Sequence, residues 1–296
     1  MTAGALAGGD GAVTAAREPL GPGSLAWRLG LPRTALMLAG RALLMQVSHP
    51  VVGAGVHDFS TFRADPWGRL ARTIGSLDVQ LFGGEQLRTE AARLRELHKT
   101  INGAGFDGRR YSALNPKAYA WVHLTVFDAT LVLRELFGPP LTASEQERFY
   151  REWRQVGLVL GIRDRDMPPG LGGFHAYVDE MVASTLDDNP SVHDLLDSLT
   201  LRSVPPPASW FPRPVWAALR PAGRTLLRDM TVGTLPGALR GRLGLTWSTA
   251  DDQRLRWEVS IVRTVVPLLP DRAMHYPLAY AARQAAKNHS AQTAAG

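Results

Sequence analysis

Hydrophobic residues recur at helical spacing along most of this chain, most clearly between residues 69 and 101. In the first half of this stretch the apolar positions are Leu70, Ile74, Leu77 and Leu81, and the polar positions are Arg69, Thr73, Ser76 and Gln80. A spacing of three or four residues places each set on one face of a helix. The pattern therefore predicts an amphipathic helix with Arg69 and Thr73 on its polar face.

A second helix follows the glycine pair at 83–84, which allows a turn. Its apolar stripe is made by Leu87, Ala91, Leu94, His98 and Ile101. His98 occupies a position where the pattern expects a hydrophobic residue, so we expect it to face inward. Glycines at 103 and 105 close the segment.

Several further helices are marked by their start signals. Asn115–Pro116 combines a capping residue with a proline in the first turn. The helix that follows, over residues 118–133, carries one formal charge, Asp128, and contains His123, which predicts a central buried helix. Thr142 and Glu145 form a capping box for a helix to about residue 160, and Asn189–Pro190 starts another short helix.

The segments on either side of these helices are less regular. Residues 24–49 form an apolar helical region that is interrupted at Pro32 and ended by Pro50. Glycines at 53 and 55 are expected to loosen the chain just before His57 and Asp58. Three prolines at 205–207 begin an irregular connection, and the last helices are expected over residues 250–266 and 271–287.

Alternating strand patterns are scarce, so the sequence predicts an all-α fold in a single domain over residues 24–288. Residues 1–23 are small and Gly-rich and are predicted to be a disordered tail, and residues 289–296 a second tail. The N-terminus lacks the features of a signal peptide, and no stretch reaches the roughly 18 uncharged apolar residues of a membrane span. A cytoplasmic location is expected.

The amino-acid composition excludes several kinds of functional site. The 296-residue chain contains no cysteine, which excludes disulfides, thiolate ligands, iron–sulfur clusters and cysteine nucleophiles. Its net charge of +6 is carried entirely by residues 201–256, which hold nine Arg, no Lys and three acids. These Arg residues are interleaved with Pro, Leu and Trp, and no nucleic-acid-binding motif is present. We interpret the region mostly as a solvated surface; peripheral membrane contact is left open.

The sequence lacks phosphate-loop, dinucleotide-binding, zinc-protease, serine-hydrolase and di-iron motifs. Each of the remaining candidate functional residues has a functional and a structural interpretation. His98 and His123 could be ligands or hydrogen-bonded core residues. His57 beside Asp58 could be an acid/base pair or a cap. The cluster of residues 69, 72 and 73 could bind anionic groups or be a solvated face.

Long ordered stretches of the chain resemble a known family. They are QVSHPVVGAGVHDFSTFRADPWGRLARTIGSLDVQLFGG, RLRELHKTINGAGFDGRRYSALNPKAYAWVHLTVFDATL, PLTASEQERFYREWRQVGLVLGI and LPGALRGRLGLTWS. Over about residues 24–285 the chain is similar to the rubber oxygenases (latex clearing proteins) and MpaB-type oxygenases. The resemblance implies a globin-related helical core that holds haem b, with a His as the proximal iron ligand.

By position, the resemblance assigns the axial role to His98 and the flanking Arg and Thr of the haem site to Arg69 and Thr73. Arg72 marks a departure, because rubber oxygenases can place there a Lys that reaches the iron, whereas a guanidinium is a poor ligand. The rubber-cleaving members also use an upstream Glu as catalytic base. No clear Glu is found here, and His57 and Asp58 are the nearest candidates.

We therefore expect a haem b-dependent oxygenase that acts with O₂ on a small hydrophobic organic substrate. In this hypothesis His98 binds iron, while Arg69, Arg72, Thr73 and His123 belong to the cofactor environment. A peroxidase-like use of the same haem is an alternative. The others are a non-catalytic haem-binding sensor and a helical interaction module that uses the basic surface of the C-terminal third.

Overall fold

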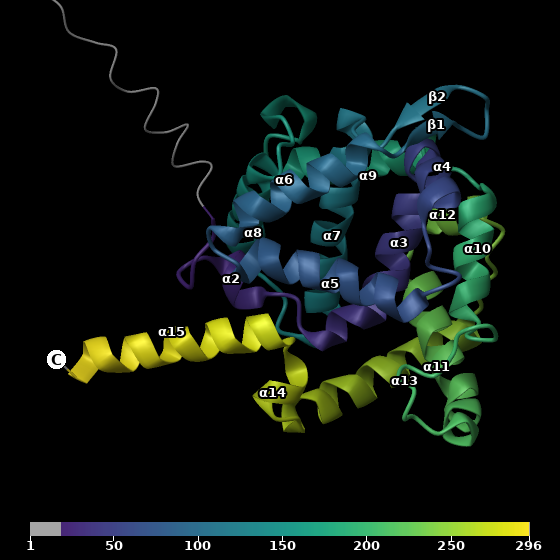
Figure 1. Ribbon diagram of the computed structural model, residues 1–296. Coiled ribbons are helices and arrows are strands. Elements are labelled where there is room, and N and C mark those ends of the chain that lie inside the picture. The colour runs from purple at the N-terminus through teal and green to yellow at the C-terminus, as the bar shows by residue number, and fades with distance from the viewer. Residues whose placement is uncertain (1–18, 296) are drawn as a thin grey trace, which may run out of the picture.

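A buried helix, α7 (Pro116–Phe137), runs through the middle of the molecule (Figure 1). It begins at Asn115, whose side-chain oxygen accepts hydrogen bonds from two backbone N–H groups of the first turn. Trp121 and Phe127 are completely buried, because nearly every face of the helix is apolar and is covered by neighbours. Asp128 is neutralised by Arg41, at 2.8 Å, on the neighbouring helix.

The computed structural model describes residues 19–295, which confirm the predicted all-α domain. Before α7 the elements are α2 (Leu25–Leu29), the 3-10 helix η1 (Arg33–Leu38), α3 (Ala39–Val47), α4 (Pro50–Phe59), α5 (Pro66–Phe82), α6 (Gln86–Lys99), and the antiparallel strands β1 (Asn102–Ala104) and β2 (Arg110–Ser112). After α7 they are α8 (Ala143–Val159), η2 (Asp164–Asp166), α9 (Leu171–Ser184), α10 (Pro190–Leu199), α11 (Arg213–Thr234), α12 (Gly237–Arg242), α13 (Thr249–Val265), η3 (Val266–Leu268), α14 (Asp271–Met274) and α15 (Pro277–Ala295).

The helix starts predicted from local signals are confirmed by their geometry. Thr142 and Glu145 form the reciprocal capping box of α8. Asn189 caps α10 by accepting two backbone hydrogen bonds of its first turn. Such caps depend on residues three or four apart, so they can be recognised without knowledge of tertiary contacts.

The prediction for the segment around Gly53 was wrong, because it forms α4. Pro50 does not simply end the preceding helix; it occupies the first turn of the next one, and the His49 ring caps that turn through Val51 N–H at 3.2 Å. Gly53 is required by close packing, since a Cβ there would lie 2.5 Å from the Val47 carbonyl oxygen. The glycine serves a contact between segments and does not loosen the helix.

The C-terminal half also differs from the predicted boundaries. Helices α9, α11 and α12 were not predicted; α11 contains Pro221 and continues through it while packing on α3 and α13. The final helix starts at Pro277 and continues to Ala295, through most of the predicted tail. The predicted N-terminal tail lies largely outside the described residues.

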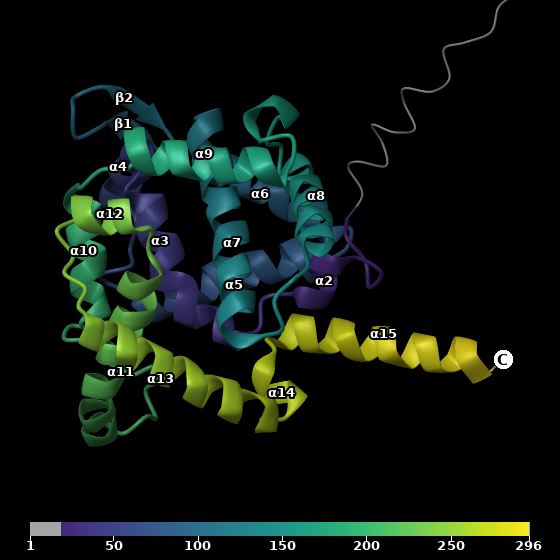
Figure 2. The ribbon, with the colours of Figure 1, turned by 180° about the vertical axis from the view of Figure 1, so that it is seen from behind.

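Two ends of the molecule are distinct in the ribbon. The β1–β2 hairpin lies at the upper edge, whereas the start of α11, α13 and α14 lie along the lower edge (Figures 1 and 2). Within residues 19–295 no single helix has the length and apolarity to cross a membrane; η1–α3 and α4 satisfy these criteria only as a pair that is bent by 106°.

Candidate functional site

Helices α5 and α6 pack against each other. Arg69 and Thr73 lie on α5, and His98 lies on α6. The start of α5 is fixed by Asp65, whose carboxylate accepts a hydrogen bond of 2.9 Å from the Gly68 backbone N–H. The two helices are linked by a hydrogen bond of 2.5 Å from the Ser76 hydroxyl to the Glu90 carboxylate. This link holds the polar face of α5 toward α6.

His98 lies in the last turn of α6, and its buried Nδ1 has no hydrogen-bond partner by distance and angle among the residues that the structure describes. The Tyr119 ring of α7 meets it edge-on, with 5.4 Å between ring centroids. Burial lowers the pKa of His98, and the charges of Arg69 and Arg93 lower it further, while the Leu94 carbonyl opposes the shift. Burial and the neighbouring positive charges therefore favour the neutral imidazole.

Arg69 is the charged group on the facing helix, and it has no carboxylate partner within the described part of the chain. Its guanidinium donates to the Thr73 hydroxyl, one turn away, and that hydroxyl donates to the Arg69 carbonyl at 3.0 Å. Desolvation lowers the pKa of Arg69, with a further contribution from the charge of Arg72. The charge of Arg69 acts on His98, and α5 packs against α6, so Arg69 and Thr73 lie on the helix that adjoins the helix of His98.

Arg72 is directed elsewhere. Its guanidinium lies 3.1 Å from the Asp65 carboxylate and 3.3 Å from the Thr61 hydroxyl, both in the loop before α5. These contacts hold it at the start of its own helix, so it contributes a charge near Arg69 but makes no contact with His98.

His57 and Asp58 do not pair with each other. His57 Nδ1 lies 3.7 Å from a carboxylate oxygen of Asp194 on α10. Asp58 accepts a hydrogen bond of 2.6 Å from the Tyr111 hydroxyl on β2. Adjacent helical residues point in different directions, so each has found a separate partner. Their predicted role in proton transfer stays a prediction.

His123 lies in the core, where its Nε2 is 2.9 Å from the Trp153 carbonyl oxygen. The two rings stack at 4.9 Å, and the Trp153 indole N–H donates to the His123 carbonyl at 3.0 Å. Burial lowers the pKa of His123 to about 4. A neutral ring with a satisfied Nε2 is well explained by a structural role.

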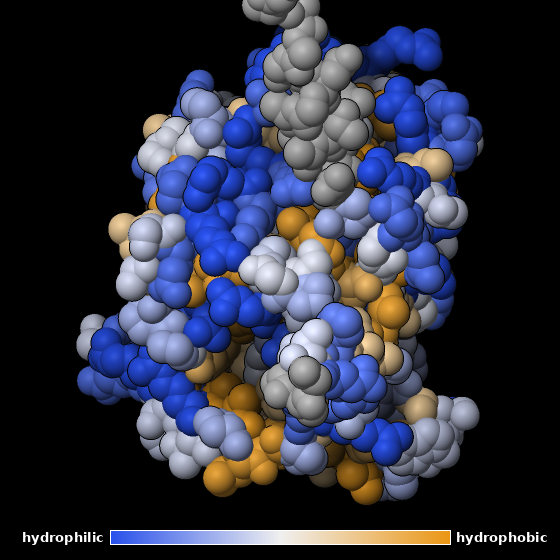
Figure 3. Space-filling view, turned by 90° about the vertical axis from the view of Figure 1, so that its left-hand side faces the viewer, coloured by the Kyte–Doolittle hydropathy of each residue, from blue (hydrophilic) through white to orange (hydrophobic). Residues whose placement is uncertain are grey.

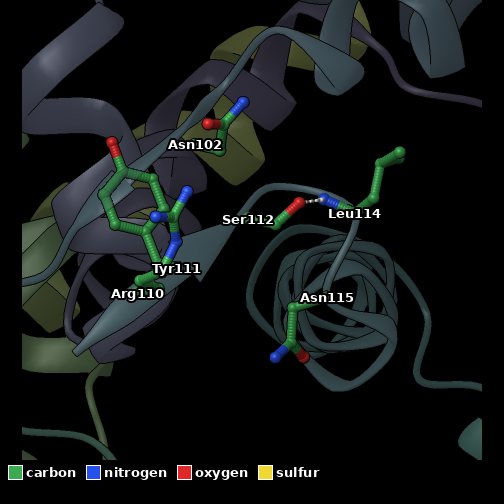
Figure 4. Close-up of a pocket in the computed structure, with 6 residues that line it drawn as sticks. All are labelled: Asn102, Arg110, Tyr111, Ser112, Leu114 and Asn115. Atoms are coloured by element: carbon green, nitrogen blue, oxygen red, sulfur yellow. Dashed lines mark hydrogen bonds between the residues drawn. The ribbon is translucent and has the colours of Figure 1, made fainter.

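Two pockets lie close to the end of α6. The first has a volume of about 490 Å³ and is polar, with Arg110 and Tyr111 on one side and Asn115 on the other (Figure 4). The second has a volume of about 320 Å³ and includes Tyr119 together with Arg95. No group of three or more His, Cys, Asp or Glu side chains among residues 19–295 could hold a metal ion by itself.

Comparison with known proteins identifies the family. The sequence model described as "ER-bound oxygenase mpaB/B'/Rubber oxygenase, catalytic domain" matches residues 27–264, which is most of the chain. The chain belongs to this family. It is an oxygenase-family protein and hence an oxidoreductase by class, in agreement with the resemblance noted from the sequence.

This oxygenase also has two similar mycobacterial relatives, the uncharacterized proteins Rv2237 of Mycobacterium tuberculosis and Mb2261 of Mycobacterium bovis. Each is 25% identical over 244 residues, which covers 80% of this chain and 91% of the relative. No solved structure matches significantly. Neither relative's description adds information on the chemistry of this chain.

Sequence reasoning missed Tyr119 and Glu90, which the oxygenase places next to the candidate site. Tyr119 contacts the His98 ring from α7, and Glu90 joins α6 to α5. Ser76 was placed on the polar face of α5, but its partner could not be inferred. No local pattern marks either contact, because each joins residues on different helices.

Proposed function

We propose that this protein is a haem b-dependent oxygenase that acts with O₂ on a small hydrophobic organic substrate, with His98 as the iron ligand. One observation carries the proposal. The buried Nδ1 of His98 has no hydrogen-bond partner, and His98 lies on a helix that packs against the helix of Arg69, whose guanidinium has no carboxylate partner among the described residues. A buried ring nitrogen normally has a hydrogen-bond partner, so the unpaired Nδ1 of His98 is the feature that a bound ligand would explain.

These residues have the chemistry that haem b requires. An imidazole can bind iron only in its neutral form, and burial keeps His98 in that form. The pair of Arg69 and Thr73 offers a positive charge and a hydroxyl, which suit an anionic group such as a haem propionate. Because the chain has no cysteine, thiolate ligation of the iron is excluded.

When bound, haem b supplies O₂ activation, which none of the twenty side chains provides. The protein's residues have other tasks. His98 would hold the iron, and as a neutral imidazole it would not first have to lose a proton. Tyr119 packs against the edge of its ring and limits rotation. The Ser76–Glu90 hydrogen bond fixes the spacing of the two helices.

An absorption spectrum of protein purified after expression with ample haem tests the assignment. The wild type should show a Soret band that is lost in His98→Ala. His175→Ala is the matched control, because His175 is exposed on α9 and should retain the band. A colourless wild type would overturn the haem proposal. Loss of the band in His123→Ala, with retention in His98→Ala, would keep the haem but move the iron ligand.

The type of chemistry is tested separately on the haem-loaded protein. Substrate-dependent O₂ consumption with hydrophobic alkenes or aromatic compounds supports the oxygenase. Turnover that requires H₂O₂ and proceeds without O₂ would indicate the peroxidase-like alternative. A stable haem protein that consumes neither oxidant would point to a sensor.

A further inference from the structure

The exposed large hydrophobic residues of this protein are concentrated in one part of the chain. Of eleven such residues among those described, eight lie between residues 210 and 269. The most exposed are Trp210 and Leu268, each at 79%, and Trp257 at 65%. Single exposed hydrophobic residues are ordinary, but a concentration of this kind marks an interaction surface.

These residues share one edge of the molecule. Trp257, Ile261 and Leu268 are spaced by four and seven residues along α13 and η3, which places them on one helical face. Leu219 lies on the first half of α11. Helix α13 and the start of α11 lie along the lower edge in Figures 1 and 2, and Figure 3 shows hydrophobic residues gathered at the lower end of the molecule. We call the surface formed by Trp210, Leu219, Trp257, Ile261 and Leu268 the lower-edge patch.

The charges beside the lower-edge patch are positive and uncompensated. Arg202, Arg213 and Arg224 are exposed and form no ion pair with any residue between 19 and 295. The three acids of residues 201–256 are already occupied, since Asp229 and Asp251 bind Arg228 and Arg254, and Asp252 binds Arg256. Positive charge therefore remains available to an external partner.

We propose that the lower-edge patch docks onto the surface of an anionic phospholipid bilayer. Exposed tryptophans and aliphatic side chains insert at the boundary between headgroups and acyl chains, while arginines bind phosphate groups. A symmetric dimer is disfavoured, because a two-fold interface brings the same patch together on both copies and would oppose arginine to arginine. A bilayer supplies both the apolar layer and the negative charge.

The lower-edge patch is also connected to the start of α5. The Trp67 indole N–H donates to the Pro205 carbonyl at 2.8 Å, and its ring lies 6.1 Å from that of Trp216 on α11. Trp67 is two residues from Arg69. Docking would thus place the helix that carries Arg69 and Thr73 near the bilayer, where a hydrophobic substrate partitions; this consequence rests on the proposed function, but the docking does not.

Co-sedimentation of the full chain with extruded vesicles tests the docking. Wild-type protein should bind vesicles of phosphatidylcholine with phosphatidylserine, and binding should weaken with added salt and with pure phosphatidylcholine. Charge reversal in R213E/R224E, and removal of apolar groups in W257Q/L268Q, should each reduce the partition coefficient about tenfold or more. Far-ultraviolet circular dichroism and thermal melting establish that the variants fold.

Matched controls lie on the β1–β2 hairpin at the opposite edge. Arg109→Glu changes a guanidinium that is 89% exposed, and Phe106→Gln changes a ring that is 44% exposed. Both should bind vesicles as the wild type does. The proposal would be overturned if these controls lost as much vesicle binding as the patch variants, or if the wild type did not bind anionic vesicles. A wild-type dimer in sedimentation velocity that W257Q/L268Q makes monomeric, without vesicle binding, would assign the patch to self-association.

Discussion

Glu258 on α13 is expected to make the stability of this protein depend on pH. Its side chain is buried, and its Oε2 has no hydrogen-bond partner in the described part of the chain. Burial raises the pKa of Glu258 from 4.5 to about 7; the neighbouring Asp229 adds to the shift and Arg254 opposes it. Asp229 is fully buried and already holds the guanidinium groups of Arg228 and Arg254. Glu258 is thus a second carboxylate beside Asp229, without a cation of its own.

The direction in which stability changes with pH follows from proton binding by Glu258. Between pH 4.5 and 7 the folded protein keeps the Glu258 proton while the unfolded chain has released it, so the free energy of unfolding falls as pH rises through this window. A pKa difference of this size lowers the free energy of unfolding by about 3 kcal/mol, and this full loss is reached only above pH 7. Since water reaches part of the side chain, we expect the free energy of unfolding to fall by about 2 kcal/mol in practice.

Glu258→Gln keeps the shape of the side chain and removes its charge. Its unfolding free energy, measured by urea denaturation with circular dichroism, should exceed that of the wild type by about 2 kcal/mol at pH 8 and by less than about 1 kcal/mol at pH 5. Glu96→Gln is the control, because Glu96 is an exposed residue on α6 and should show no such dependence on pH. A difference for Glu258→Gln that is equal at both pH values would refute the reasoning.

Two further substitutions test contacts around the site. Tyr111→Phe removes the hydrogen bond of 2.6 Å to Asp58, and it should lower the unfolding free energy by about 1–2 kcal/mol in the same urea assay; an unchanged value would show that the bond adds nothing. Gly157→Ala would place a Cβ 2.9 Å from His123 Nε2, so it should cost about 1–3 kcal/mol and lower Tm, whereas Gly172→Ala, with open space around it, should not. Equal Tm values for both would contradict the tight packing at residue 157.

Local signals in the sequence were sufficient for much of the fold. Asn115 and Thr142 cap their helices through bonds to residues two or three positions away, so the starts of α7 and α8 could be predicted. Gly53 shows the limit of this reasoning. Its closeness to the Val47 carbonyl and the Asn189 side chain depends on how segments pack, and a glycine in sequence does not reveal whether it frees the chain or admits a neighbour.

The candidate site, too, was predicted only in part from the sequence. The helical period alone predicted that Arg69 and Thr73 share a face and that His98 faces inward. It predicted the same for His123, and only the tertiary structure separated the two. The Trp153 carbonyl oxygen satisfies Nε2 of His123, whereas Nδ1 of His98 is buried without a hydrogen-bond partner and its ring packs against Tyr119 in a T-shaped arrangement. Periodicity fixes the direction of a side chain, but its partners come from other helices, and those contacts decide whether an inward histidine is structural or available to a ligand.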